Sequence, residues 1–119
     1  TSVNHSILGK KAEDAACSFL IKNGLELITR NYKCRYGEID LIMQDQDTLV
    51  FVEVRYRKSA DYGSALESID TGKQRRLVFT ANHYLSQLPA LPTSRFDIIA
   101  LTENQSPEWI IDAFMEDGG

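Results

Sequence analysis

Two neighbouring apolar segments of this chain carry charged residues at alternate positions. The segments are Glu38-Ile39-Asp40-Leu41-Ile42 and Val50-Phe51-Val52-Glu53-Val54-Arg55. Alternation with a period of two is typical of β-strands, and the polar residues 45–48 between the segments are turn formers. We therefore expect an antiparallel β-hairpin that places three acids and an arginine on otherwise apolar strands.

The loop length sets which charges face one another. A loop of two or of four residues gives the same register, with Asp40 opposite Glu53 and Glu38 opposite Arg55. Facing side chains lie about 5 Å apart, so two carboxylates there repel unless a cation neutralises them. A loop of three residues is the alternative, and it would leave each acid paired with a nearby arginine.

The residue types indicate which cation would suit the facing acids. Neither segment contains histidine or cysteine, and carboxylate oxygens suit Mg²⁺ or Mn²⁺ better than zinc. The pattern therefore favours metal-assisted chemistry on phosphate. Glu38 is expected to pair with Arg55 rather than to bind metal.

Length and composition are those of one globular domain, residues 1–119. The hydrophobic content of 43% and the charged content of 25% are ordinary. No apolar run reaches the roughly 18 residues of a membrane span, and no secretory signal is recognisable, so we expect a cytoplasmic protein without membrane contact. Cys17 and Cys34 are expected to be free thiols.

The net charge of −4 counts against a protein that coats nucleic acid, but the charge is unevenly distributed. Between residues 53 and 76, six basic residues stand against four acids. Such residues are most often solvated surface charge, and only their clustering with Tyr56 and Tyr62 favours phosphate contact. The six are Arg55, Arg57, Lys58, Lys73, Arg75 and Arg76.

Periodicity and capping residues predict the remaining elements. We expect a helix from a Ser6 cap to about residue 23, a strand at 25–29, a polar connection at 30–37 and an exposed loop at 56–63. A second helix is expected from a cap at Asp70 or Thr71 to about Leu88, followed by strands at 95–101 and 109–114. This order predicts an α/β fold with a central mixed β-sheet flanked by helices. Asp97 is expected to form a structural ion pair with Arg95.

The spacing of Glu13, Gly37-Glu38-Ile39-Asp40 and Glu53-Val54-Arg55 resembles that of the PD-(D/E)xK nuclease superfamily. Within it, the whole chain resembles the YraN family of bacterial proteins. The resemblance implies a restriction-endonuclease-like three-layer sandwich. It also implies cleavage or binding of structured or branched DNA, as in Holliday-junction resolvases, and a homodimer would suit cutting of two strands.

The resemblance also implies roles for individual residues. Asp40 corresponds to the motif aspartate and Glu53 to the second carboxylate that binds Mg²⁺ or Mn²⁺. The Val54 carbonyl would be a further ligand, and Glu13 would be an outer one.

Arg55 departs from the superfamily pattern, which usually has lysine at this position. An arginine stays protonated, so Arg55 can hold phosphate but cannot act as a general base. Lys73 is a candidate replacement at the start of the second helix, and Gln74 resembles a polar helix residue near superfamily sites. The alternatives are a catalytically inactive nucleic-acid-binding module with a nuclease fold, and a protein-interaction scaffold.

Overall fold

The computed structural model describes residues 2–57, 69–102 and 106–114. The elements follow the order that the sequence predicts: helix, three strands, helix, two strands. They are α1 (Ser2–Lys22), β1 (Glu26–Cys34), β2 (Gly37–Asp45), β3 (Thr48–Arg57), α2 (Thr71–Leu85), β4 (Thr93–Thr102) and β5 (Glu108–Phe114).

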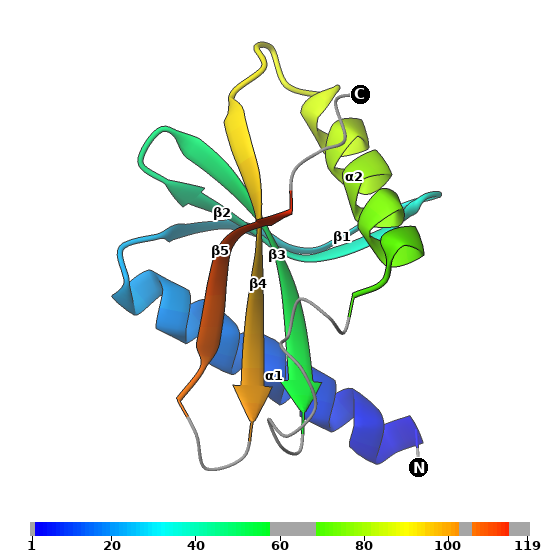
Figure 1. The fold of residues 1–119 in the computed structure, drawn as a ribbon, viewed down its shortest axis with the longest axis vertical. Coiled ribbons are helices and arrows are strands. Elements are labelled where there is room, and N and C mark those ends of the chain that lie inside the picture. The colour runs from blue at the N-terminus through cyan, green and yellow to red at the C-terminus, as the bar shows by residue number, and fades with distance from the viewer. Residues whose placement is uncertain (1, 58–68, 103–105, 115–119) are drawn as a thin grey trace.

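The five strands form one mixed sheet in the order β1-β2-β3-β4-β5 (Figure 1). Strands β3 and β4 are parallel, and the other neighbours are antiparallel. Parallel neighbours need a long crossover connection, and the segment that contains α2 provides it. The predicted α/β class with a mixed sheet is confirmed.

The predicted hairpin register is confirmed from Leu41 to Asp45, but the predicted pairs Asp40–Glu53 and Glu38–Arg55 lie beyond the end of the ladder. Leu41 pairs with Val52 and Asp45 pairs with Thr48, so the loop is the two residues Gln46 and Asp47. Gln46 has a φ of 54°, a left-handed conformation that tight hairpin turns commonly require.

The ladder between β2 and β3 runs only from Leu41 to Asp45 on the β2 side. Beyond it, β2 continues along β1 to the pair of Gly37 with Cys34, whereas β3 continues along β4 to the pair of Arg57 with Thr102. The two strands therefore fork, as Figure 1 shows where β3 leaves the β1–β2 hairpin.

Each helix buries a separate core against one face of the sheet. On β3, Val50 and Val52 belong to the cluster that includes α1, while Leu49 and Phe51 belong to the cluster that includes α2. Successive side chains of a strand point to opposite faces, so α1 and α2 cover opposite sides of the sheet. Helix α1 crosses behind β3 and β4 in Figure 1. In the described part of the chain, no helix is long and apolar enough to cross a membrane.

Two predictions near the N-terminus were wrong in detail. Ser6 lies inside α1, which begins at Ser2, so Ser6 is not its cap. The strand expected at 25–29 continues to Cys34 because pairing with β2 extends to the end of the hairpin. This long-range pairing outweighs the polar composition that favoured a loop at 30–37.

The predicted boundaries further along the chain need smaller corrections. Asp70 is the N-cap of α2, and its Oδ1 accepts a hydrogen bond of 2.7 Å from the backbone N–H of Lys73. The helix ends at Leu85, one turn before the expected Leu88. Residues 56 and 57 belong to β3 rather than to a loop because they pair with β4, and residues 58–63 lie outside the described residues.

Asp97 forms the predicted ion pair with Arg95, at 3.0 Å from Nε to Oδ1. The carboxylate is buried and also accepts hydrogen bonds of 2.9 Å from the Trp109 indole N–H and from the backbone N–H of Asp112. It thereby ties β4 to β5. Cys17 and Cys34 are free, as predicted.

Candidate metal centre

The fork between β2 and β3 opens into a cleft of about 390 Å³ beside α1. Glu13 lines the cleft from α1 and Asp40 lines it from β2. The residues of β3 that follow Glu53 form the remaining wall. The lining residues are Gly9, Ala12, Glu13, Asp40, Val54, Arg55 and Tyr56. Three residues that the sequence assigned to a metal site, Glu13, Asp40 and Val54, therefore share one cavity.

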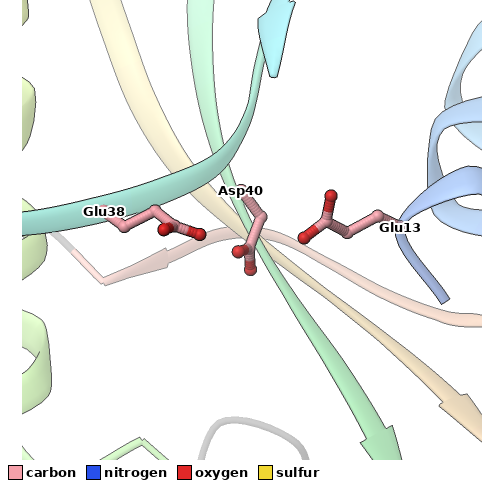
Figure 2. A group of neighbouring side chains, drawn as sticks. All are labelled: Glu13, Glu38 and Asp40. Atoms are coloured by element: carbon pink, nitrogen blue, oxygen red, sulfur yellow. The ribbon is translucent and has the colours of Figure 1, made fainter. Parts of the chain in front are cut away.

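Three carboxylates converge at this cleft (Figure 2). One oxygen from each of Glu13, Glu38 and Asp40 lies within 4.8 Å of the others. Glu38 and Asp40 are two residues apart on β2 and so share a face, whereas Glu13 approaches from α1. The sequence placed Glu13 with Asp40 but did not assign Glu38 to the group.

Residues of β1 hold two of these acids in place. The Arg30 guanidinium lies 3.3 Å from Glu13. The Asn31 amide donates to both Glu13 carboxylate oxygens at 3.1 Å and to Glu38 at 3.5 Å. Asn31 has a φ of 53°, which asparagine tolerates better than most residues. The sequence did not predict this bridging role of Asn31. The only signal was an asparagine within a polar stretch, which is too common a pattern to indicate a site.

The Asp40 carboxylate bridges β2 and β3 at the point where the two strands separate. Its Oδ2 accepts a hydrogen bond of 2.8 Å from the backbone N–H of Val54, beyond the last pair of the β2–β3 ladder. Burial, and then the negative charge of Glu53, raise the pKa of Asp40 from 3.8 to about 8. Burial and the neighbouring carboxylates thus favour the protonated form of Asp40 at neutral pH. Such an excess of buried carboxylate is the environment that a divalent cation would stabilise.

Glu53 lies on the side of the fork that faces α2. Its side chain is 5% exposed, and Oε2 lies 3.4 Å from the Lys73 Nζ and 3.6 Å from the Arg55 Nη1. The structure therefore brings Lys73 to the predicted site across 20 residues of sequence, as the sequence reasoning had suggested. The helix N-cap at Asp70 positions this first turn.

The ion pair expected between Glu38 and Arg55 is replaced by other pairs among the described residues. Glu38 lies 3.5 Å from the Lys33 Nζ, and Arg55 is paired with Glu53. The register itself was right, but the strands separate before they reach Glu38 and Arg55.

The described residues that were assigned to nucleic-acid contact lie on α2 and at the end of β3. Arg75 and Arg76 are exposed on α2. Gln74 is half-buried, and its side-chain amide donates to the Ile69 carbonyl at 3.2 Å. Arg57 ends β3, and Lys58 lies outside the described residues.

Comparison with known proteins matches most of the chain to one protein family. Residues 12–101 match the model of a family described as "Uncharacterised protein family UPF0102". A UPF0102 protein of Psychromonas ingrahamii is 54% identical over 109 residues, which cover 91% of this chain and 89% of the relative. Relatives in Nitrosococcus oceani and Cupriavidus taiwanensis are 44% and 50% identical, covering 92% of this chain and 93% and 83% of their own lengths. These matches include the candidate metal centre, and the chain belongs to the UPF0102 family, for which YraN is another name.

Proposed function

We propose that this protein is a Mg²⁺- or Mn²⁺-dependent endonuclease that hydrolyses phosphodiester bonds in structured or branched DNA. The observation that carries the proposal is the buried Asp40 carboxylate, whose pKa is raised to about 8 beside Glu13, Glu38 and Glu53. Helices on both faces of a mixed sheet are compatible with a restriction-endonuclease-like sandwich.

The donor set fits a hard divalent cation because it consists of carboxylate oxygens. Asp40 and Glu53 would hold the ion, with Glu13 and the Val54 carbonyl as further ligands. Glu38 joins this set through its position beside Asp40. When bound, the ion would supply Lewis-acid polarisation of the scissile phosphate and a lowered pKa of bound water.

Two cationic side chains lie beside Glu53, where they could contact the phosphate. Lys73 and Arg55 both approach Glu53, and both are about one third exposed. Arginine is not a general base, so the role of Arg55 is to offset negative charge as it develops in the transition state. Lys73 takes the place of the motif lysine and orients the attacking water or a phosphate oxygen.

A second candidate function is a DNA-binding module that has lost catalysis. The observation that favours it is Arg55, which stands where the superfamily pattern has lysine and which is already paired with Glu53. In such a module, phosphate contacts would carry affinity, and binding would depend on salt rather than on the metal.

Cleavage assays on labelled four-way junctions, forks and duplexes with Mg²⁺ or Mn²⁺ separate the two functions. We expect the unmodified protein to cut a branched substrate and Asp40→Asn to abolish cutting. The matched control is Asp14→Asn, which removes an exposed acid of α1. Undiminished turnover by Asp40→Asn would refute the metal assignment. Salt-sensitive binding without cutting, equal in both variants and the unmodified protein, would establish the inactive module.

A further inference from the structure

A cluster of exposed aromatic rings lies where the β1–β2 hairpin meets α2. We call Tyr36, Phe79 and His83 the aromatic platform. The Tyr36 ring centroid is 5.6 Å from that of Phe79 and 6.4 Å from that of His83. Tyr36 is 36% exposed and Phe79 47% exposed. These rings are not needed to fill either core, because neither Tyr36 nor Phe79 belongs to the two core clusters.

The platform is held by close approach of the hairpin to the helix. Gly37 has a φ of 150°, and a Cβ atom built there would lie 3.3 Å from the Thr80 hydroxyl oxygen. The Tyr32 hydroxyl forms a hydrogen bond of 2.6 Å with Nδ1 of His83 and holds that ring in place. The Gln87 amide donates to the same hydroxyl at 2.6 Å. The rings are therefore pre-positioned, which lowers the entropy cost of binding a planar ligand.

Arg35 contacts the Tyr36 ring, and Lys73 and Arg76 lie on the same helix as Phe79. The Arg35 guanidinium carbon lies 4.9 Å from the Tyr36 ring centroid, and its Nη2 donates to the Tyr36 hydroxyl at 2.8 Å. On α2, Arg76 is three residues from both Lys73 and Phe79, so its side chain neighbours each of theirs on the helix surface. At a rise of about 1.5 Å per residue, Phe79 lies about 9 Å along the helix axis from Lys73.

The nearby acids are already engaged. Glu38 pairs with Lys33, and Asp70 caps α2. The surface from Lys73 to the platform thus combines exposed positive charge with exposed aromatic rings, on a chain whose net charge is −4. Positive charge beside stacking surfaces is complementary to a nucleic-acid strand with unpaired bases. In a duplex, the faces of the bases are covered by their neighbours and are not available to such rings.

We propose that the aromatic platform binds a single-stranded segment of DNA next to the candidate metal centre. Unpaired bases stack on Tyr36 and Phe79, while Arg35 and Arg76 contact the flanking phosphates. As a deepening of the proposed function on which it rests, this assigns substrates with an unpaired arm or flap, rather than uninterrupted duplex, to the site.

The test is fluorescence anisotropy in EDTA at low salt, where no cleavage occurs. The probes are a labelled 20-nucleotide oligothymidine and a blunt 20-base-pair duplex. We expect tighter binding of the single strand. The double variant Tyr36→Leu/Phe79→Leu should lose at least about fivefold in affinity for it, because stacking contributes roughly 1–3 kcal/mol per base. Binding of the duplex should change by less than twofold.

Two controls keep the result interpretable. Phe79→Tyr keeps an aromatic ring and should retain single-strand affinity. Ile111→Ala removes an apolar side chain on β5 that is at least as exposed as Phe79, and it should have no effect. Equal affinity for the two probes, no binding of either, or an unaltered double variant would overturn the proposal. Because this assay needs no metal, its failure is distinct from failure of the nuclease assignment, which Asp40→Asn tests through cleavage.

Discussion

Replacing Asp40 by asparagine should stabilise the metal-free protein at neutral pH. The folded state raises the pKa of Asp40 from 3.8 to about 8, so it binds the proton more tightly than the unfolded chain does. By linkage, the free energy of unfolding then falls as pH rises between these two values. The penalty is absent below about pH 3.8 and is complete above about pH 8.

The size of the effect follows from the same shift. Each pKa unit corresponds to about 1.4 kcal/mol. At pH 7 the folded protein keeps a proton on Asp40 that the unfolded chain has released, which costs at most about 4 kcal/mol. Water entry and local relaxation reduce such penalties, and we expect about 2 kcal/mol. Asparagine carries no charge, and its side-chain oxygen can still accept the hydrogen bond from the Val54 N–H.

Thermal unfolding followed by circular dichroism in EDTA measures this prediction. For a domain of this size, about 2 kcal/mol corresponds to a rise in Tm of roughly 8 °C. We expect that rise for Asp40→Asn near pH 7, shrinking toward zero near pH 4, and no comparable pH-dependent rise for Asp14→Asn. A lower Tm for Asp40→Asn at pH 7, or a difference that does not vary with pH, would refute the reasoning.

Three further predictions concern the metal, the carboxylate between β4 and β5, and the lysine beside Glu53. Calorimetric titration with Mn²⁺ should show saturable binding that Asp40→Asn abolishes. Below about pH 8, binding should release a proton, so the measured enthalpy should depend on the ionisation enthalpy of the buffer. Equal binding by both proteins would contradict the site. Asp97→Ala should lower the free energy of unfolding in urea by about 3 kcal/mol or more, because it leaves buried donors, including the Trp109 N–H, unpaired; a loss below about 1 kcal/mol would show that water replaces the carboxylate. If the protein cuts DNA, Lys73→Ala should lower kcat at least about tenfold without changing the far-ultraviolet spectrum, while Lys22→Ala, on α1, should not; an unaffected kcat would remove Lys73 from the reaction.

The parts of the fold that the sequence predicted well depend on local interactions. The β2–β3 register follows from strand alternation and the short polar turn, and it was right to the residue over Leu41–Asp45. The start of α2 follows from the capping carboxylate of Asp70, which acts on the next turn of the same helix. Such signals act over a few residues, so no knowledge of the tertiary structure is needed to read them.

The candidate site was predictable only in part. Glu13, Asp40 and Val54 share the cleft, as the family resemblance implied, and Lys73 reaches Glu53. The inclusion of Glu38 and the bridging Asn31 was not predicted. Both depend on how β1 lies against β2 and α1, which sequence periodicity does not report.

The amino-acid sequence alone determines the order and approximate positions of the strands and helices, and the acids that they carry, because side-chain periodicity and turn chemistry are local. Only the tertiary structure decides that β2 and β3 separate beyond the pair of Leu41 with Val52. Past this pair, β2 continues to pair with β1, and β3 continues to pair with β4. At this separation, Glu13 approaches Glu38 and Asp40 from α1, while Lys73 approaches Glu53 from α2. The charge balance of the site, and with it the raised pKa of Asp40, arises from burial at this fork.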